Sequence, residues 1–504
     1  INPNAFAVRN SSYLDGTNDV YATNNLLINP PGLTEIIGEK GPEVGDQRPL
    51  SAHPLAELQW YFLQNNTPWE HQEYPGLNNQ PNVLHVMMDW GGGVQKWVDD
   101  FIASHPALNH YILVSEGEFF RQQQGEKFKL HWHNNRLPAI KEFQLRRPNK
   151  ATFTTHAEYQ TIFKNVLIDC DITAVFVSSL IGHSMDCLDS DLPTFRILHD
   201  YFPHWPSLNA QLDKELIDEE MLNAALDKST VEPLGKITEH QLQQWQAQNN
   251  NLLSKPQTRV VAPNQSVADN LKKLEHSSCF NKIQVIPHGV NFIEPIDYQI
   301  TKDTFKILVL GRISEPKGQK LLLECIDSFK LNNNIEFVLL GAGKSGAIFA
   351  ELPRVHVIED YQQPELQQTV KKLSPQLALL CSITSETFSY TLSELQMMGL
   401  PVLATKVGAF KDRIDNNNTG FLEVPDAQSL HKRILKLQNN PELLVQVSHE
   451  TSSLKHNSLL ENAQAYNDLL KVFNLPGSIY PIRGLVKPSP LAQLAKTTHK
   501  EINR

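Results

Sequence analysis

The sequence predicts an α/β protein with two doubly wound, parallel-sheet domains in tandem. A short apolar strand at residues 83–88 runs into a glycine loop and then a helix, which is how such domains open. A second series of the same kind starts with a strand at residues 306–310. The chain has 504 residues, a length typical of about three domains with full-sized cores.

Composition narrows the class of protein further. Hydrophobic residues make up 40% and charged residues 20%, which excludes a disordered chain, a collagen and a small disulfide scaffold. The net charge of -10 gives no sign of a nucleic-acid-binding protein. Five widely spaced cysteines without a C-x-x-C pair favour reduced thiols in a cytosol. No apolar run approaches the ~20 residues of a membrane span, and no secretory signal opens the chain.

The first half of the chain is expected to hold an extension and one domain. Residues 1–80 are rich in Asn, Pro and Gly and are predicted to be irregular, with a helix at 53–63. Residues 81–300 are expected to form the first domain, and residues 263–266 read as a cap for a helix over 267–274. After the opening strand, buried strands are predicted at 110–115, 172–179, 194–199, 259–262 and 283–286.

The second half repeats the pattern. Residues 291–304 carry no strong pattern and are expected to link to a second domain over 301–470. Near-continuous apolar strands that alternate with helices indicate parallel sheets covered on both faces. After the strand at 306–310, strands are predicted at 335–340, 355–358, 377–381, 402–405 and 420–424. Residues 471–504 are expected to be a tail that packs back on the first domain or binds a partner.

The most informative stretch of the second domain runs from Ser382 to Gly408. Glu386 is expected in a loop after a strand, and Glu394 in the early turns of a helix that stops at residues 399–401, Gly-Leu-Pro. The free amides and positive dipole end of such a helix suit a diphosphate. The carboxylates can accept hydrogen bonds from sugar and ribose hydroxyls. Each glutamate alone fits an ordinary surface position, but loop, helix start, spacing and stop occur together.

This stretch resembles the family 4 glycosyltransferases of the GT-B fold. The family's signature is glutamate, seven residues, glutamate, then a Gly-Leu-Pro-Val strand, as at Glu386, Glu394 and residues 399–402. The wording Glu-Thr-Phe-Ser-Tyr-Thr-Leu-Ser-Glu is similar to members that build bacterial surface polysaccharides such as O-antigen and capsule. The chain departs from the family at Ser389, where glycine is usual, although a serine amide can still reach a phosphate.

A second constellation is the run from Gly311 to Gly318, which leaves the carboxyl end of the second domain's first strand. Open α/β sheets bind ligands at that edge. Arg312 and Lys317 can neutralise a departing diphosphate there, the arginine as a fork and the lysine as a point charge. The run resembles the family's Gly-Arg…Lys-Gly motif. Two ordinary surface cations are the alternative.

Two stretches of the first domain add to the resemblance. Residues 89–93, Asp-Trp-Gly-Gly-Gly, look like the family's loop against donor and acceptor, although a plain tight turn accounts equally well for three glycines alone. The run from Ile197 to Pro206 is similar to the family's His-Asp-Tyr-…-Pro string, whose histidine contacts the donor sugar; here that histidine is His199. His183 is a second candidate, for which a structural role fits better.

The resemblance covers roughly residues 82–470 and implies two facing Rossmann-like domains with an active-site cleft between them. It implies that Arg312 and Lys317 hold the diphosphate, and that Glu386 and His199 hold the transferred sugar. Glu394 is implied on the ribose. Further donor contacts are implied at Phe388, Ser389, Tyr390, Gly311, Gly92 and Gly93. Acceptor contacts are expected at Asp200 and Tyr201.

The resemblance also implies retention of anomeric configuration without a metal, with leaving-group stabilisation as the main catalytic term. The pairs Asp169/Asp171 and Asp189/Asp191 resemble metal-binding aspartates of the other major glycosyltransferase fold, which a GT-B enzyme does not need. Residues 341–345 mimic the end of a P-loop, but Val338 replaces a required glycine. The nucleotide sugar is thus expected as co-substrate, and no cofactor or metal is expected.

The implied partners are a nucleotide-sugar donor and a glycan or lipid-linked glycan acceptor, with no nucleic acid. The implied place is the cytoplasm, with peripheral association at the inner face of the inner membrane. Because the chain begins with Ile1, and residues 50–80 look like a linker between fused glycosyltransferases, a longer parent protein is expected. Two other classes stay open: a catalytically silent GT-B module that binds glycan or a partner transferase, and a GT-B nucleotide-sugar epimerase or hydrolase.

Overall fold

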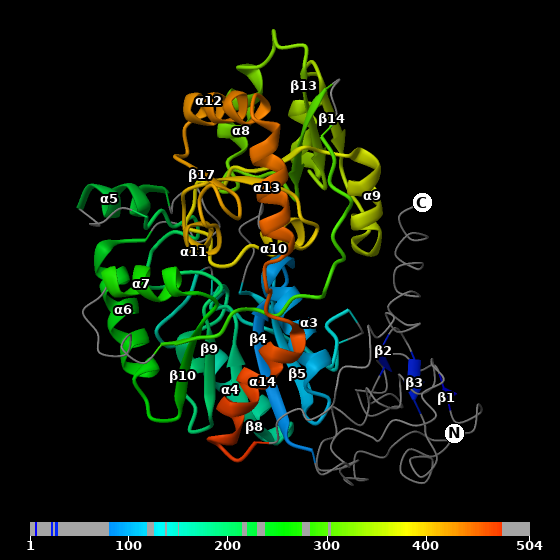
Figure 1. The fold of residues 1–504 in the computed structure, drawn as a ribbon. Coiled ribbons are helices and arrows are strands. Elements are labelled where there is room, and N and C mark those ends of the chain that lie inside the picture. The colour runs from blue at the N-terminus through cyan, green and yellow to red at the C-terminus, as the bar shows by residue number, and fades with distance from the viewer. Residues whose placement is uncertain are drawn as a thin grey trace, which may run out of the picture.

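The computed structural model shows two α/β domains, one above the other in Figure 1. It describes residues 80–117, 125–136, 139–149, 151–213, 219–228, 237–274, 283–300 and 304–475. It also describes three short paired strands near the N-terminus, β1 (Phe6–Ala7), β2 (Ala22–Thr23) and β3 (Leu26–Ile28). The helix expected at 53–63 and the tail expected beyond residue 475 lie outside the described residues.

The first domain is built on an eight-stranded sheet in the order β11-β10-β9-β8-β4-β5-β6-β7. Its six strands from β11 to β5 are parallel and correspond to the six strands predicted from sequence. The strands are β4 (Asn82–Met88), β5 (Asn109–Glu116), β6 (Lys127–Trp132), β7 (Lys141–Gln144), β8 (Ile172–Val177), β9 (Thr194–Ile197), β10 (Thr258–Ala262) and β11 (Gln284–Val285).

The edge strands β6 and β7 run antiparallel and were not predicted. Strand β6 reads Lys-Phe-Lys-Leu-His-Trp, and the alternation of its first four residues is a half-buried strand pattern that could have revealed it. Phe128 and Leu130 point into the core, while Lys127 and Lys129 lie on the other face. The first sheet is therefore a parallel core with an antiparallel edge.

Two hydrophobic cores cover the two faces of this sheet. On strand β4, Leu84 and Val86 belong to one core, and Val83 and Met87 to the other, because successive side chains of a strand point to opposite faces. This explains why the sequence of β4 is apolar almost throughout. The helices of the domain are α3 (Gly92–Ser104), α4 (Ala157–Asp169), α5 (Glu219–Lys228), α6 (Glu239–Leu253) and α7 (Gln265–Lys273). Asn264 caps α7 by accepting from the Val267 N–H, as predicted.

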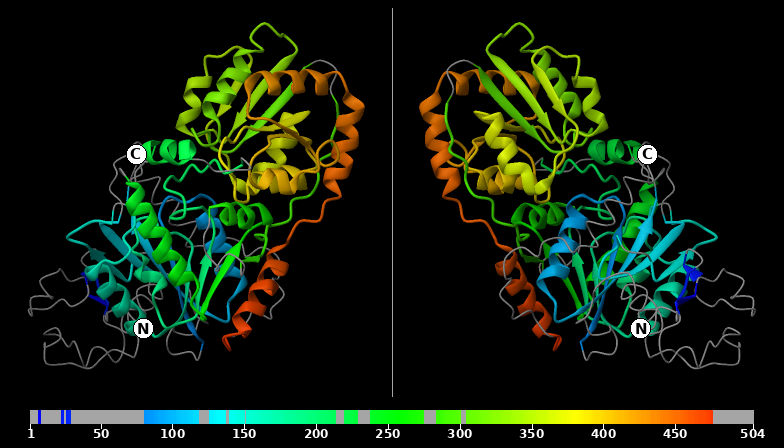
Figure 2. Two further views of the ribbon diagram at one scale, coloured as in Figure 1. Left: turned by 90° about the vertical axis from the view of Figure 1, so that its left-hand side faces the viewer. Right: turned by 90° about the vertical axis from the view of Figure 1, so that its right-hand side faces the viewer.

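The second domain has a six-stranded, fully parallel sheet in the order β14-β13-β12-β15-β16-β17. All six strands match predicted ones; they are β12 (Phe305–Leu310), β13 (Ile335–Leu340), β14 (Val355–Ile358), β15 (Leu377–Leu380), β16 (Val402–Thr405) and β17 (Phe421–Glu423). The helices are α8 (Gln319–Asp327), α9 (Leu366–Leu373), α10 (Tyr390–Met397), α11 (Ala409–Arg413), α12 (Ala427–Gln438) and α13 (Pro441–Ser452). They cover both faces (Figure 2).

The last helix, α14 (Leu459–Lys471), crosses back to the first domain, as Figures 1 and 2 show. Tyr466, Leu469 and Leu470 pack in the core that also contains Val83 and residues of α3. Sequence analysis grouped these residues with the second domain over 301–470, so the spatial division differs from the expected boundary. The helix carries no signal of its partner, because an amphipathic pattern shows only that a face is buried.

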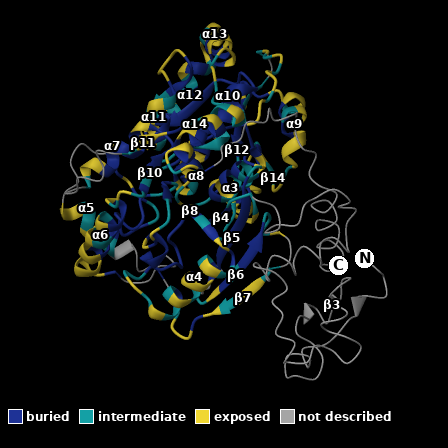
Figure 3. Ribbon diagram, turned by 90° about the horizontal axis from the view of Figure 1, so that it is seen from below, coloured by how far each residue is buried: buried dark blue, intermediate teal, exposed yellow. Residues whose placement is uncertain are grey.

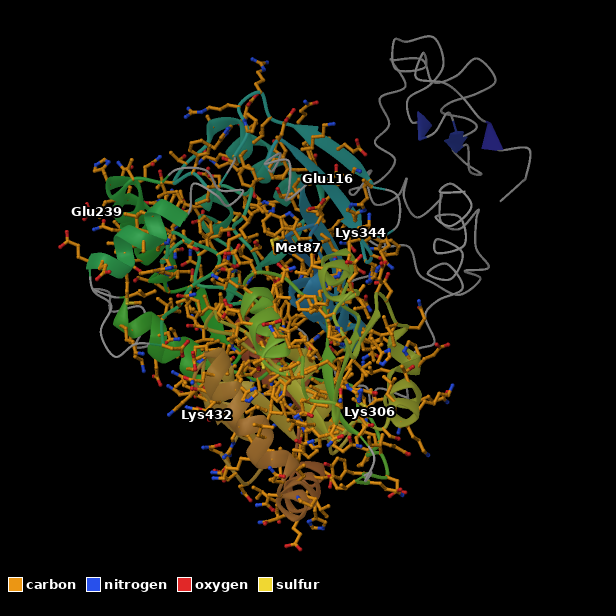
Figure 4. The ribbon with its side chains drawn as sticks, turned by 90° about the horizontal axis from the view of Figure 1, so that it is seen from above. Met87, Glu116, Glu239, Lys306, Lys344 and Lys432 are labelled. Atoms are coloured by element: carbon orange, nitrogen blue, oxygen red, sulfur yellow. The ribbon has the colours of Figure 1, made fainter. Side chains whose placement is uncertain are left out.

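The central strands of both sheets are buried, whereas the edge strands β7 and β11 are largely exposed. Many exposed residues lie on the outer faces of the helices, as Figure 3 shows from below. Charged side chains such as Glu239 and Lys432 stand at the periphery in Figure 4, with Met87 near the centre. The four described cysteines, Cys170, Cys187, Cys325 and Cys381, are free and buried. None of the described helices has the length and apolar character that a bilayer span requires.

Candidate functional site

The loop after strand β12 carries two predicted cations, Arg312 and Lys317. Gly311 follows the strand directly and has φ of 100°. Gly318 ends the loop with φ of 78°, and a Cβ there would lie 1.8 Å from the carbonyl oxygen of Cys381. Because only glycine fits so close to the end of β15, the loop is held against that strand. Lys317 is thereby kept beside the residues that follow β15.

The loop after β15 enters helix α10 through a strained residue. Ser389 has φ of 67° and ψ of 90°, and its side chain accepts a hydrogen bond from the Leu392 N–H. A positive φ is unfavourable for serine, which gives a physical reason for the glycine usual in similar sequences. The first N–H groups of a helix have no acceptor within it, so this end of α10 offers donors to an anion.

These two loops enclose one cavity, which we call the strand-end pocket. It brings together predicted residues from separate stretches of sequence, namely Gly311, Arg312, Lys317, Glu386 and Ser389. It lies at the carboxyl ends of β12 and β15, where open α/β sheets bind ligands. Its wall also includes Ser314, Cys381, Ser382, Thr391 and Phe410.

Glu386 is the acid that lines the strand-end pocket. Its side chain is 9% exposed, and its Oε1 lies 2.5 Å from the Nζ of Lys317. The Ser382 hydroxyl also donates to this oxygen. Gly408 packs on the backbone of Glu386 so closely that a Cβ would lie 2.3 Å from both its N and its O. A charged pair at the floor of the pocket is thus held by backbone packing as well as by hydrogen bonds.

Glu394 lies one turn into α10 and outside the residues that line the strand-end pocket. Its Oε1 accepts a hydrogen bond of 2.8 Å from Gln363 Nε2. Burial raises the pKa of its carboxyl, and the hydrogen bond from Gln363 and the charge of Lys96 oppose that rise. The ring of Tyr361 packs against Gly341, where a Cβ would lie 2.6 Å from the ring. Glu394 therefore sits beside the loops that follow β13 and β14.

His199 belongs to an aromatic cluster between the domains. Its ring lies 5.1 Å from that of His288 and 5.6 Å from that of Trp97, and His288 lies 4.8 Å from Phe388. Burial lowers the pKa of His288 to about 3 and that of His199 well below its usual range. The buried Nε2 of His199 has no hydrogen-bond partner within the described part of the chain. His199 is therefore a neutral ring at pH 7 with one nitrogen free to bond.

The cluster reaches the strand-end pocket through the loop before α10. The Thr387 hydroxyl donates to the His199 carbonyl oxygen at 2.9 Å, and Tyr390 stacks on His288 with ring centroids 5.8 Å apart. Sequence analysis predicted His199, Phe388 and Tyr390 but missed Trp97 and His288. Their signal was weak, because an isolated aromatic residue is usually a core residue.

The glycine loop of the first domain faces Tyr390. A Cβ on Gly93 would lie 3.7 Å from that ring, and Lys96 Nζ lies 5.2 Å from the ring centroid. Gly91 and Gly92 have φ of 73° and 67°, and space beside both is open. They line a second cavity, the α3 pocket, with Asp89, Gln95, Lys96, Asp99, Asp100, Asn135 and Arg136. Tyr390 thus lies between the two pockets.

Asp200 and Tyr201 point into the first domain and line neither pocket. Asp200 accepts hydrogen bonds from Arg196, at 3.5 Å, and from the Phe202 N–H, at 3.1 Å. Tyr201 is 3% exposed, and its hydroxyl accepts from Asn270. Both side chains stabilise the interior of the first domain through these hydrogen bonds, so the geometry gives no support to the expected acceptor contacts. His183 is likewise buried, between Tyr159 and the Met87 carbonyl.

A carboxylate that sequence analysis missed joins the two domains. Asp213 of the first domain accepts hydrogen bonds from the Gly408 N–H at 2.8 Å and the Ser385 hydroxyl at 2.6 Å, and pairs with Lys411 at 2.6 Å. Ser385 and Gly408 are the residues that bracket Glu386 in space. Asp213 therefore ties the backbone around Glu386 to the first domain. An isolated aspartate in a loop has no sequence signature for such a contact.

The aspartates that resemble a metal site and the residues that resemble a P-loop take part in local structure. Asp189 pairs with Lys255, and Gly343 precedes a short 3-10 helix, η6 (Lys344–Phe349). Throughout the described ranges, no group of three or more His, Cys, Asp or Glu side chains is arranged to hold a metal ion.

Comparisons with known proteins bear on the second domain and on the fold. Residues 292–453 match the family model described as Glycosyl transferases group 1, which spans strands β12 to β17 and helices α8 to α13. The match to this family model therefore coincides with the second domain. A search of curated proteins found no match.

Solved structures resemble the chain over most of its length. Sucrose-phosphate synthase (tll1590) from Thermosynechococcus elongatus matches 78% of this chain and 100% of its own, with 14% identity and a TM-score of 0.53. Anabaena Alr3699/HepE in complex with UDP-glucose matches 78% of this chain and 99% of its own, with 14% identity and a TM-score of 0.49. The likeness to the synthase shows the fold, which is the GT-B arrangement of two α/β domains.

Proposed function

We propose that the protein transfers a sugar from a nucleotide-sugar donor to a glycan or glycolipid acceptor, with retention of anomeric configuration. The single observation that carries this proposal is the strand-end pocket. It combines Arg312, Lys317, Glu386 and the start of helix α10 at the carboxyl edge of the domain that matches the Glycosyl transferases group 1 family model. A fixed pair of cations and a helix N-terminus suit a diphosphate, and the adjacent carboxylate suits sugar hydroxyls.

The cations are proposed to act on the leaving group. Negative charge develops on the diphosphate oxygen as the bond to the sugar breaks, so a contact with Arg312 or Lys317 strengthens in the transition state. Lys317 is 49% exposed and pairs with Glu386, so it can turn to the diphosphate while it stays near the carboxylate. No metal is required for this stabilisation, and we expect activity to persist in a chelator.

Glu386, His199 and Glu394 are proposed to orient the donor. Glu386 accepts from hydroxyls of the transferred sugar, and the neutral His199 offers its free nitrogen to the same sugar. Glu394 is proposed for the ribose, and the hydrogen bond that it accepts from Gln363 supports this, because a ribose hydroxyl can donate to the same carboxylate. Gly311, Phe388, Ser389 and Tyr390 are proposed to shape the donor site around these groups, with Gly92 and Gly93 closing it from the first domain.

The acceptor is proposed to enter by the α3 pocket, which Tyr390 separates from the strand-end pocket. Its lining of carboxylates, amides and two cations suits the hydroxyls of a glycan. By resemblance, the acceptor is a growing bacterial surface polysaccharide such as O-antigen or capsule, lipid-linked at the cytoplasmic face of the inner membrane. The departing diphosphate is proposed to take the acceptor's proton.

Calorimetric titration with UDP, GDP, dTDP and ADP tests the donor site, with the Arg312→Ala/Glu394→Ala double variant as the control. We expect one nucleotide to bind selectively and the double variant to lose that binding. Acceptor-dependent turnover would then separate a transferase from an epimerase, which needs no acceptor. A folded protein that binds none of the four nucleotides would contradict the proposal and favour a silent glycan-binding module.

A further inference from the structure

Arg413, the last residue of helix α11, contacts the backbone that leads into α10. Its Nη1 donates to the carbonyl oxygens of Phe388, at 2.5 Å, and Ser389, at 3.0 Å, and its Nη2 donates to the Ser393 hydroxyl at 2.7 Å. Its guanidinium also lies over the ring of Phe388, 4.4 Å from the centroid. One side chain thus binds two consecutive carbonyl groups at the entrance of the helix.

These contacts determine where the neighbouring amides point. In a planar trans peptide the N–H is directed opposite to the C=O. Two carbonyls that meet one nitrogen atom therefore turn the N–H groups of Ser389 and Tyr390 to the opposite side. Both N–H groups precede the first bond of the helix, from the Ser393 N–H to the Ser389 carbonyl, and neither has an acceptor within the described part of the chain. Ser389 lines the strand-end pocket.

The charge of Arg413 has no opposite partner close by. No carboxylate of the described residues lies within ion-pair distance of its guanidinium, since its partners are two carbonyls and a hydroxyl. Burial lowers the pKa of Arg413 to about 10, so the side chain remains protonated at pH 7. The histidines nearest to its charge, His288 and His456, have pKa values of about 3 and about 4, lowered by burial and then by Arg413, so both are neutral.

Arg196, an arginine in the interior of the first domain, shows a different arrangement. Arg196, which is 1% exposed, also donates to backbone carbonyls, those of Val177, Ile197 and Phe202. It is neutralised, however, by Asp200 at 3.5 Å. A cation set inside a protein ordinarily has such a counter-charge. Arg413 has the same bonds without the acid, so a bound anion in the strand-end pocket would supply the missing charge.

We propose that Arg413 is a positioning residue for the diphosphate: it aims the amides of Ser389 and Tyr390 at the strand-end pocket and supplies positive charge behind them. This inference rests on the proposed function and adds a third cation to Arg312 and Lys317. It also explains how Ser389 holds a positive φ without being glycine, since the two hydrogen bonds to Arg413 offset the strain.

The test compares Arg413→Met with Arg433→Met in the full chain. Arg433 is a matched control, because it also lies over a phenylalanine ring of the second domain, 4.9 Å from the centroid of Phe421, and lines neither pocket. The probe is inorganic pyrophosphate, measured by calorimetry and by the shift that it causes in Tm. We expect Arg413→Met to weaken pyrophosphate binding roughly tenfold or more and to remove most of the shift, as loss of a charge-assisted set of bonds does. Arg433→Met should change neither.

Further measurements separate positioning from a purely structural role. Arg413→Lys keeps the charge but loses the two guanidinium nitrogens that make the hydrogen bonds. Its affinity for pyrophosphate should therefore lie between those of the wild type and Arg413→Met. The affinity for a nucleoside without phosphates should not change. In the wild type, hydrogen exchange of the peptide that spans residues 388–391 should slow when pyrophosphate is bound. This last experiment needs no variant, so unchanged exchange would overturn the inference even if Arg413→Met does not fold.

The possible failures can be told apart. The proposed function itself fails at the diphosphate site in two cases. Either the wild type does not bind pyrophosphate, or the Arg312→Ala and Lys317→Ala variants bind it as well as the wild type does. If binding depends on Arg312 and Lys317 while Arg413→Met binds normally, only the present inference is overturned. Unchanged hydrogen exchange at residues 388–391, with pyrophosphate bound in an Arg312-dependent way, would also overturn it.

Discussion

The two domains differ in where they place their titratable side chains. The first domain holds several histidines in its interior as neutral rings, among them His85, His105, His110, His183 and His204. The second domain exposes His356 and His449 at its surface and keeps the charges of Arg312, Lys317 and Arg413 at or behind one pocket. The buried histidines of the first domain are thus neutral near pH 7, whereas the second domain keeps permanent positive charge around one pocket. Stability and binding should therefore respond to different changes in the two domains.

The largest effect expected from this contrast is acid unfolding of the first domain. Burial lowers the pKa of His85 and His204 to about 3, that of His105 and His183 to about 4, and that of His110 well below its usual range. The unfolded chain binds protons below about pH 6.5, and the folded domain does not until its own lower pKa values are reached. Stability is therefore full above that pH and falls, by about 1.4 kcal/mol per pH unit for each such histidine, as the pH drops toward 4.

Tryptophan fluorescence can follow this transition, because no tryptophan occurs after Trp245. As the pH falls from 7 to 4, we expect the fluorescence to change before the far-UV circular dichroism is fully lost. His105→Gln should move the fluorescence midpoint to lower pH, whereas His356→Gln, at an exposed site, should not. A single transition seen equally by both probes would remove the contrast between the domains.

Loss of a pocket cation should have the next largest effect, mainly on turnover. Lys317→Ala removes a contact to the developing charge and leaves Glu386 without its partner, so we expect kcat to fall by about 10²–10³, as when a preorganised transition-state donor is lost. Donor KM should change less. Lys320→Ala is the control, because that exposed lysine of α8 contacts only Glu324, at 3.9 Å, among the described acids. Equal losses in both variants would place the effect outside the pocket.

Gly408→Ala should have a moderate effect on both stability and turnover. The added methyl would lie 2.3 Å from backbone atoms of Glu386, at a residue with φ of 47° that disfavours a side chain. We expect a cost of about 1–3 kcal/mol from overpacking, together with displacement of Glu386 and a lower kcat. Thermal unfolding and steady-state kinetics measure the two effects. Gly343→Ala is a control, since an added Cβ there would have Arg312 Cγ as its nearest neighbour, at 4.0 Å, and the φ of Gly343 is also positive. A normal kcat in Gly408→Ala would show that the position of Glu386 does not depend on this contact.

The smallest effect is expected at Asp213, a carboxylate of the first domain that forms an ion pair with Lys411 of the second domain. Asp213→Asn keeps the shape of the side chain but loses the ion pair with Lys411 and part of its hold on Ser385 and Gly408. We expect kcat to fall by up to about tenfold, the worth of one partly buried charged hydrogen bond. Asp189→Asn, which breaks a pair with Lys255 inside the first domain, should leave kcat unchanged. An unaffected kcat in Asp213→Asn would mean that the tie between the domains is not needed for turnover.

The second domain could be predicted from sequence further than the first, for a physical reason. Gly311, Arg312, Lys317, Glu386 and Ser389 all lie in the loops that follow β12 and β15 of one parallel sheet, so local pattern and topology together predict that they meet. The strands of the first domain were also predicted, except for the edge pair β6 and β7.

Side-chain direction in the first domain could not be predicted in the same way. Asp200 follows a strand as the pocket residues do, but it turns inward because Arg196, four residues earlier, needs a counter-charge. Asp213, Arg413 and the return of α14 depend on contacts between residues far apart in the chain, and no local pattern encodes such contacts. The positive φ of Ser389 is likewise visible only in three dimensions.

The return of α14 has a mechanical consequence. The chain passes between the domains twice, and the two crossings touch: Val290 pairs with Ser458, the Val290 N–H bonds the Asn457 carbonyl at 2.9 Å, and Gly289 packs on the first turn of α14. Because the two crossings are joined at one place, they form a hinge between the domains. The second domain should therefore rotate about this hinge as a rigid body. Its rotation is more restricted than it would be on a single connecting segment.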